Sequence, residues 1–130
     1  MNCSLFRLNW CLQHKKKRYK MDIIDHIGIR VDDLKEAEMW YLKRLKAEVT
    51  FRSDKYIRLK VGNTNIALID KVYYPWAHVR ILVQNKEDLP EKGYRVKHRD
   101  GTIGVYVEDP FGNYLEYIWY SQDQSETFLK

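Results

Sequence analysis

The sequence predicts an α+β domain built from two copies of one strand-helix-three-strand module. Two observations carry this prediction. Apolar and polar residues alternate in many short stretches, and that period of two is typical of strands rather than helices. The second half also repeats the order of the first, because AHVRILV matches DHIGIRV and GNYLEYI matches GNTNIALI about fifty residues later. A constant spacing of this kind indicates an internal duplication.

The first module is expected to begin with a strand, IIDHIGIRV, in which His26 and Gly28 share one face and the apolar residues share the other. Asp32 and Asp33 follow and offer an N-cap to a helix whose apolar residues recur at helical spacing. Three short strands complete the module, with a turn over 62–65 between the last two. The expected elements run over 23–31, 33–46, 47–52, 56–62 and 65–70.

The second module has the same order with a shorter helical segment. Its expected elements run over 77–83, 85–93, 94–99, 103–109 and 114–120. Asp100-Gly101 and the DPFGN run supply the turns between the last three strands, since Asp, Asn, Gly and Pro favour turns. We therefore predict modules of about 22–70 and 77–120 within one domain of 21–122, followed by a tail at 123–130.

Length and composition agree with one domain. A chain of 130 residues with 45% apolar content can bury one real core but not two. It has no run of about eighteen apolar residues, so a transmembrane helix is not expected. Both cysteines, Cys3 and Cys11, precede the domain. This predicts a reducing compartment, which we take to be the cytoplasm, and it leaves His, Asp and Glu as the available metal ligands.

The positive net charge of +5 belongs to the first twenty residues. Six of the 23 basic residues and none of the 18 acidic ones lie in 1–20, which leaves 17 basic residues for the remainder. A cluster such as KKKRYK can bind nucleic acid or an anionic surface. We instead expect a disordered arm, with Met21 as an alternative start. Nucleic acid is expected at most through this arm, and no membrane contact is expected.

Glu116 stands in the apolar run YLEYIWY. A buried carboxylate without a partner is costly, so it needs a metal, a cation or a proton. Arg30 and Arg80 alternate onto the same faces as His26 and His78, and pairing with one of them is one solution. A metal ion bound between Glu116 and histidines is the other.

Taken together, these stretches resemble the vicinal oxygen chelate superfamily, which includes glyoxalases, fosfomycin and bleomycin resistance proteins and extradiol ring-cleaving dioxygenases. The resemblance rests on DHIGIRVDDLKEAEMWYLKRL, AHVRILV and VYVEDPFGNYLEYI, and it covers nearly all of 22–120. It implies a vicinal oxygen chelate fold, in which each βαβββ module forms a half-barrel. Two modules would then enclose a metal and substrate cavity.

In that superfamily the metal ligands come from the first and last strands of each module. The matching positions here are His26, Ala67, His78 and Glu116. The resemblance implies that the two histidines and the glutamate bind a divalent metal. Such a set leaves coordination positions open and suits Fe(II) or Mn(II) with oxygen-donor substrates. Glyoxalases typically use all four positions, so the alanine speaks against a glyoxalase I reaction.

The order of residues from Val96 to Glu116 is similar, position by position, to the signature of extradiol dioxygenases. His98, Tyr106 and the Asp-Pro-Phe-Gly run occupy the matching places. In that family the histidine and tyrosine contact substrate or oxygen, so the resemblance implies catalytic roles for His98 and Tyr106. A further cavity histidine of many such enzymes is missing, since the corresponding region reads Asn-Thr-Asn at 63–65.

We therefore predict a small metal-dependent enzyme that oxidises a catechol-type or other vicinal-oxygen small molecule, and that forms a homodimer. One alternative is a thiol transferase or lyase of the fosfomycin-resistance or glyoxalase type. Fosfomycin itself is not expected, because Gly28 stands where those enzymes have a threonine and their lysine- and serine-rich loop reads KHRDGTIG. The other alternative is a metal-free protein of the bleomycin-resistance type that holds an aromatic ligand with Tyr74, Trp76 and Trp119.

Overall fold

Both predicted modules are present in the structure. The computed structural model describes residues 21–121, so the expected arm at 1–20 and tail at 123–130 lie outside the described residues. The first module contains β1 (Ile23–Val31), α2 (Leu34–Arg44), β2 (Glu48–Arg52), β3 (Tyr56–Val61) and β4 (Thr64–Asp70). The second contains β5 (His78–Leu82), η1 (Lys86–Asp88), β6 (Tyr94–Lys97), β7 (Ile103–Glu108) and β8 (Tyr114–Trp119). The predicted element order is confirmed, although the second helical segment is a single 3-10 turn.

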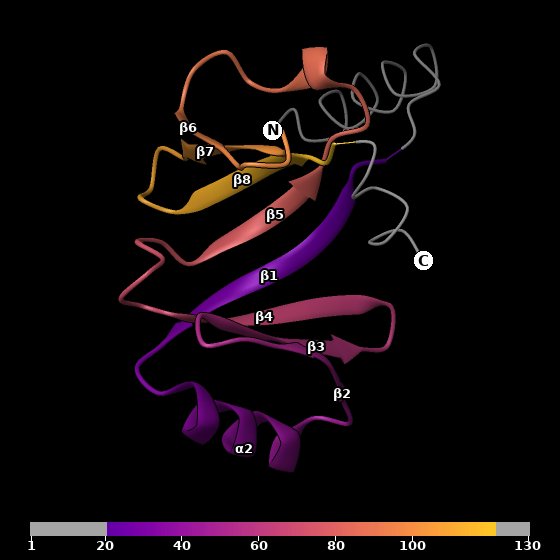
Figure 1. The fold of residues 1–130 in the computed structure, drawn as a ribbon, viewed down its shortest axis with the longest axis vertical. Coiled ribbons are helices and arrows are strands. Elements are labelled where there is room, and N and C mark those ends of the chain that lie inside the picture. The colour runs from indigo at the N-terminus through magenta and orange to yellow at the C-terminus, as the bar shows by residue number, and fades with distance from the viewer. Residues whose placement is uncertain (1–20, 122–130) are drawn as a thin grey trace, which may run out of the picture.

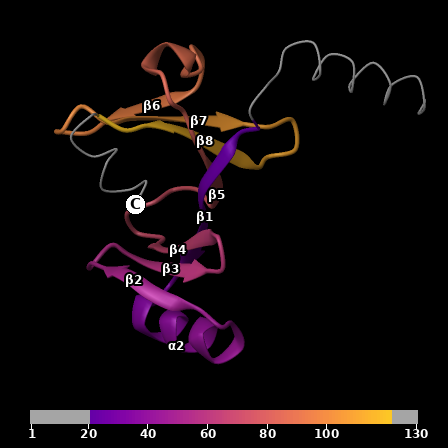
Figure 2. The same cartoon turned by 90° about the vertical axis from the view of Figure 1, so that its right-hand side faces the viewer.

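All eight strands form one sheet with the order β2-β3-β4-β1-β5-β8-β7-β6. The first strands of the two modules, β1 and β5, lie side by side at its centre and run antiparallel (Figure 1). In each module the last strand is parallel to the first. Figure 2 shows β2 to β4 with α2 at one end and β6 to β8 at the other, joined through β1 and β5. The halves are therefore related by an approximate twofold rotation.

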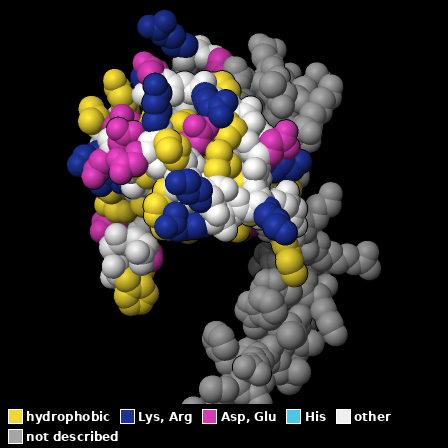
Figure 3. Space-filling view, turned by 90° about the horizontal axis from the view of Figure 1, so that it is seen from below, with side chains coloured by type: hydrophobic (Ala, Val, Ile, Leu, Met, Phe, Trp, Pro, Cys, Tyr) yellow, Lys and Arg dark blue, Asp and Glu magenta, His cyan; other side chains and the backbone are white. Residues whose placement is uncertain are grey.

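The helix α2 begins where the sequence predicts an N-cap. The Asp33 carboxylate accepts a hydrogen bond from the backbone N–H of Glu36 at 2.9 Å, which satisfies one of the free N–H groups at the helix start. Its inner face packs through Leu34, Ala37 and Tyr41. The outer face of the helix points to solvent, and Figure 3 shows basic, acidic and apolar side chains interspersed at this end of the molecule.

The apolar core lies in two clusters, one in each module. Ile57, Leu59 and Leu68 are buried beneath α2. The second cluster has Leu89, from the segment after η1, packed against Ile103 and Val105 of β7. Trp119 packs against this second cluster. The prediction that Trp119 lines the ligand cavity is therefore wrong, because alternation along β8 puts Trp119 on the opposite face from Glu116.

The other face of the sheet, opposite the two cores, carries the polar residues that the sequence singled out. No helix in 21–121 is long and apolar enough to cross a membrane.

Candidate metal centre

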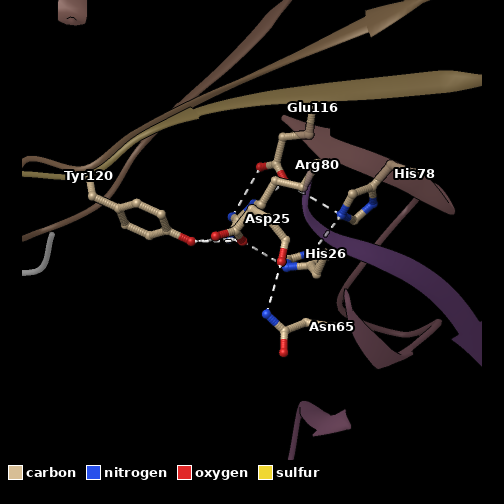
Figure 4. A network of polar contacts seen from close by, with 7 residues as sticks. All are labelled: Asp25, His26, Asn65, His78, Arg80, Glu116 and Tyr120. Atoms are coloured by element: carbon tan, nitrogen blue, oxygen red, sulfur yellow. Dashed lines mark hydrogen bonds and ion pairs between the residues drawn. The ribbon is translucent and has the colours of Figure 1, made fainter. Parts of the chain in front are cut away.

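The sheet register gathers the three predicted ligands on one face of the central strands. Residues paired across neighbouring strands point to the same face. His26 on β1 is paired with Arg80 on β5, and Arg80 is paired with Glu116 on β8. His78 precedes Arg80 by two residues and so shares its face. All three ligand positions are thus supplied by one chain (Figure 4).

The spacing of the three side chains fits a single divalent cation. The candidate ligand atoms of His26, His78 and Glu116 lie within 4.8 Å of one another. The two histidine Nε2 atoms are 3.2 Å apart, and His78 Nε2 is 3.4 Å from Glu116 Oε1. Two ligands bound at about 2.1 Å to one ion, at octahedral or tetrahedral angles, lie about 3.0 to 3.4 Å apart. All three side chains are buried, and they could hold a metal ion.

The second ring nitrogen of each histidine faces an acceptor. His78 Nδ1 lies 2.9 Å from the Trp76 carbonyl oxygen, which can only accept, so this nitrogen carries the proton. His26 Nδ1 lies 3.1 Å from Asp25 Oδ2, at ion-pair distance but without hydrogen-bond geometry. Both environments favour a proton on Nδ1 and a lone pair on Nε2. Two lone pairs that face each other at 3.2 Å call for a proton or a cation between them.

Both histidines are neutral near pH 7. Burial lowers the pKa of His26 to about 4, although the neighbouring Asp25 carboxylate acts in the opposite direction. Burial also lowers the pKa of His78. The neutral imidazole is the form that binds metals, so no proton has to be displaced at physiological pH.

Arg80 joins the candidate ligands to a second carboxylate. Its Nε donates to Glu116 Oε1 at 2.6 Å, and its Nη2 donates to Oε2 at 3.3 Å. On the other side, Nη1 donates to the Tyr120 hydroxyl at 3.1 Å, and this hydroxyl donates to Asp25 Oδ2 at 2.9 Å. Burial raises the pKa of Glu116, but the Arg80 guanidinium outweighs it and the net shift is downward. The pKa of Asp25 is also lowered on balance, so both carboxylates are ionised.

Two glycines leave the space that the ligands fill. A Cβ atom on Gly28 would lie 2.6 Å from His78 Cε1, and one on Gly104 would lie 2.6 Å from Glu116 Oε2. Both distances are far shorter than ordinary van der Waals contact. Glycine at position 28, where the fosfomycin-resistance enzymes have a threonine, is therefore explained in this chain by the room that the His78 ring needs.

Ala67 occupies the fourth position of the site face. It is buried on β4 and is paired with Gly28 on β1 and with Arg58 on β3. Its methyl group cannot bind a cation. The first module thus offers one candidate ligand and the second offers two.

The structure places the two predicted catalytic residues differently. Tyr106 is buried and is paired with Glu116 across β7 and β8. Its ring lies edge-on to the His78 ring, with the two centroids 5.3 Å apart. Burial, together with the Glu116 charge, raises the pKa of Tyr106, so the phenol keeps its proton. His98 follows β6 and is exposed, although its side chain borders the same cavity. Tyr106 therefore contacts the candidate ligands directly, whereas His98 lies at the solvent-exposed border.

A cavity of about 800 Å³ opens over the site face. Much of its lining is aromatic, and the segment between β4 and β5 contributes Tyr73, Tyr74 and Trp76. Cationic side chains also border it, namely Lys55, Arg58 and Arg80. The volume is sufficient for a small organic molecule.

Residues 23–117 match the family model of the Glyoxalase/Bleomycin resistance protein/Dioxygenase superfamily. The chain belongs to this superfamily. The predicted vicinal oxygen chelate fold is thereby confirmed, as the eight-stranded sheet of two βαβββ modules requires. No curated protein matches the sequence at a significant level.

Several solved structures share the architecture at low identity. Hypothetical protein BH1468 from Bacillus halodurans C-125 is 18% identical, with a TM-score of 0.61 over 79% of this chain and 97% of that one. A superfamily member from Vibrio splendidus 12B01 is 11% identical, with a TM-score of 0.56 over 77% and 100%. Methylmalonyl-CoA epimerase from Mycobacterium tuberculosis is 14% identical, with a TM-score of 0.58 over 79% and 91%. At these identities the similarity establishes the fold alone.

Sequence reasoning missed part of the site in this superfamily member. Asp25 and Tyr120 were not expected to take part, and Arg80 was considered only as an alternative partner for Glu116. Asp25 reaches the site because the β1–β5 register shifts between Ile24 and His26, and such a bulge re-aims a side chain. In the sequence, the signal for the role of Asp25 was its position directly before His26.

Proposed function

We propose that this chain is a metal-dependent enzyme whose substrate binds through two neighbouring oxygen atoms. In this proposal His26, His78 and Glu116 bind Fe(II) or Mn(II). The observation that carries it is the pair of buried, neutral histidines whose Nε2 atoms face each other at 3.2 Å beside the Glu116 carboxylate. Oxygen and imidazole ligands with open coordination positions suit these two metals.

The charges around the cluster support a divalent cation. Asp25 and Glu116 are negative, Arg80 is positive and the histidines are neutral, so the buried group carries one net negative charge. A divalent cation would convert this to one net positive charge. A substrate that chelates as a monoanion would then make the whole site neutral, which is the least costly state in a buried environment.

The reaction we propose is the extradiol-type oxidation of a catechol-type substrate by O2, in which a ring C–C bond beside the two hydroxyl-bearing carbons breaks and both oxygen atoms of O2 enter the product. When bound, the metal would supply Lewis acidity, which lowers the pKa of a coordinated hydroxyl. Tyr106 keeps its proton and is placed to donate a hydrogen bond to an anionic substrate oxygen. His98 borders the cavity and would accept a proton that leaves the substrate. The matched order of His98, Tyr106 and Glu116 in the sequence supports this choice of reaction.

Arg80 and the Trp76 carbonyl would orient the ligands rather than react. The bidentate contact with Arg80 fixes the Glu116 carboxylate, and the Trp76 carbonyl fixes the His78 ring. Partners of this kind hold metal ligands in their binding geometry.

The test is anaerobic loading with Fe(II) or Mn(II), followed by measurement of metal content and of oxygen uptake with a panel of catechols. Wild type should bind one metal per chain, and His78→Ala and Glu116→Gln should bind none. Tyr106→Phe is the matched control, because it should keep the metal while turnover falls about a hundredfold. A metal-free wild type after loading would refute the proposal. Metal binding without oxygen uptake would refute oxidation and support the lyase or transferase alternative.

One observation favours a second candidate, a metal-free protein that binds a planar ligand. Arg80 already neutralises Glu116 through two hydrogen bonds, and Tyr74 and Trp76 offer aromatic surface in the cavity. Aromatic residues in a concave site favour binding of ring systems. Ligand affinity that is unchanged in His78→Ala would support this candidate, whereas loss of affinity would support the metalloenzyme.

A further inference from the structure

We infer that the substrate is an aromatic acid, whose carboxylate binds Arg58 while its two neighbouring oxygens face the His-His-Glu cluster. This inference rests on the proposed function, since it names the substrate class of the same cavity. It follows from the placement of Arg58 on the site face, from the distribution of aromatic and cationic side chains around the cavity, and from the charge of the centre.

Arg58 and His78 lie on one row of paired residues with almost no side chain between them. Arg58 is paired with Ala67, Ala67 with Gly28, and Gly28 with His78. The row crosses three strand spacings, or about 14 Å between the outer Cα atoms. The two intervening residues contribute only a methyl group and a glycine hydrogen, and the His78 ring itself lies over Gly28. The room that the row leaves is therefore over Ala67, between the His78 ring and Arg58, and Arg58 lines the cavity.

The internal duplication makes the position of Arg58 informative. Arg58 is paired with Ala67 on the last strand of the first module, as Tyr106 is paired with Glu116 on the last strand of the second. The two halves thus place a cation and a phenol at equivalent positions on either side of the cluster. The chain has an alanine at position 67, where the second module has the candidate ligand Glu116, and a guanidinium beside that position.

An aromatic cluster around Trp76 forms part of the cavity lining. Trp76 stacks on Tyr114 with centroids 4.4 Å apart, and its ring also contacts Tyr106 at 5.3 Å and Tyr94 at 5.7 Å. Of these residues Trp76, Tyr94 and Tyr106 line the cavity, as does Tyr56 of the first module. Lys55 and Arg58 border the cavity from the first module, and Arg80 borders it from the second. A ring packed against Trp76 would therefore direct an acidic substituent toward the first module.

The net charge of the metal-bound site explains why a carboxylate on the substrate would need a separate cationic partner. With a divalent cation and a monoanionic chelate the buried group is neutral, so it offers no attraction to a further negative charge. Arg58 lies within electrostatic reach of Tyr120, which is hydrogen-bonded to Asp25, since burial raises the pKa of Tyr120 and the charges of Arg80 and Arg58 oppose that rise. An arginine also matches a carboxylate through two parallel hydrogen bonds.

On the opposite side, the acidic residue at the border of the cavity is already engaged. Asp100 accepts a hydrogen bond from the backbone N–H of Thr102 at 2.8 Å within a turn. This places negative charge near His98. An anionic substituent is therefore favoured next to the cationic residues Lys55 and Arg58, which also line the cavity.

The experiment compares two catechol probes on Mn(II)-loaded protein by isothermal titration calorimetry. The probes are 3,4-dihydroxybenzoate and 4-methylcatechol, which differ in the carboxylate. Wild type should bind the acid at least about tenfold more tightly, as expected for a charge-assisted hydrogen bond. Arg58→Gln should abolish this preference and Arg58→Lys should restore most of it. Lys60→Gln removes a charge from an exposed residue of the same strand and should leave the preference unchanged.

A preference that is absent in wild type, or that persists in Arg58→Gln, overturns the inference. Failure of 3,4-dihydroxybenzoate to bind wild type also overturns it. Metal content is measured in the same samples and tests the proposed metal-dependent function separately. If Mn(II) does not bind but the acid is still preferred through Arg58, the metalloenzyme proposal fails and the substrate class stands for a metal-free protein.

Discussion

At the scale of single residues, Glu116 serves two partners at once. Arg80 contacts both of its oxygens, while His78 faces Oε1 from the other side at 3.4 Å. A carboxylate has enough lone pairs for a guanidinium and one further cation. A buried ion pair of this kind contributes little net stability. Its value in this chain is orientation, because it holds the carboxylate at the spacing that a metal would require.

Gly28→Ala tests how closely the His78 ring is fitted. The new methyl group would lie 2.6 Å from His78 Cε1, so the ring must move away from the cluster. We expect metal affinity to fall at least about tenfold, although alanine is otherwise the better strand residue by about 0.5 to 1 kcal/mol. Mn(II) titration and thermal unfolding measure the two effects. Unchanged metal affinity would show that the ring has room and would contradict the fit described above.

At the scale of secondary-structure elements, alternation predicted which residues share a face within each strand. The grouping of His26, His78 and Glu116 came from the resemblance to the superfamily, and the register puts all three on one face. The alternation of one strand could not predict an irregularity such as a bulge. Asp25 reaches the site through a bulge, and a bulge depends on the partner strand rather than on the period of one strand.

Two other misses have different causes. Arg80 lies on the predicted face, but its contacts with Glu116 and Asp25 depend on the strand order β1-β5-β8, which comes from tertiary pairing. Trp119 was assigned to the cavity from its residue type, although the alternation of β8 already placed it opposite Glu116. Local periodicity determines the face of a side chain, and long-range pairing determines its contacts.

The start of α2 gives a matched pair of variants. Asp33 caps the helix through the Glu36 N–H, whereas its neighbour Asp32 forms an exposed ion pair with Lys71. We expect Asp33→Ala to lower the free energy of unfolding by about 1 kcal/mol. Asp32→Ala should change it little, because exposed ion pairs are weak. Urea denaturation of both variants measures the difference, and equal effects would contradict the assigned cap.

The turn between β7 and β8 predicts a defined pH dependence. Asp109 Oδ1 accepts backbone hydrogen bonds from Asn113 at 2.8 Å and Phe111 at 2.7 Å, and these contacts lower its pKa below the ordinary value of 3.8. A lowered pKa in the folded state means that the charged form stabilises the fold above about pH 4 and that this contribution is lost as pH falls further. Asp109→Asn should therefore lower the melting temperature at pH 7 by a few degrees.

The same comparison at low pH provides the control for Asp109. Both proteins contain the same other acids, so their titration cancels in the difference between the two melting temperatures. This difference should shrink as the pH is lowered below about 4. A difference that stays constant down to pH 3 would mean that the charge of Asp109 does not stabilise the turn.

At the scale of the whole molecule, the two apolar clusters are separate and the polar centre lies between the modules. One cluster packs under α2 and the other under the segment that follows η1. The candidate ligands come from β1 of the first module and from β5 and β8 of the second. A cation bound by all three would therefore connect the two halves of the sheet, in addition to the β1–β5 hydrogen bonds. Its effect should appear in the stability of the entire described domain.

Metal binding should consequently stabilise the chain against unfolding. A ligand that binds only the folded state at a hundred times its dissociation constant adds about 2.7 kcal/mol. For a domain of this size we expect the melting temperature to rise by about 10 °C when Mn(II) is added and to fall again with a chelator. His78→Ala should show no rise, because the cluster retains two of its three ligands and its affinity collapses. A rise of equal size in His78→Ala would mean that the stabilising cation binds elsewhere on the molecule.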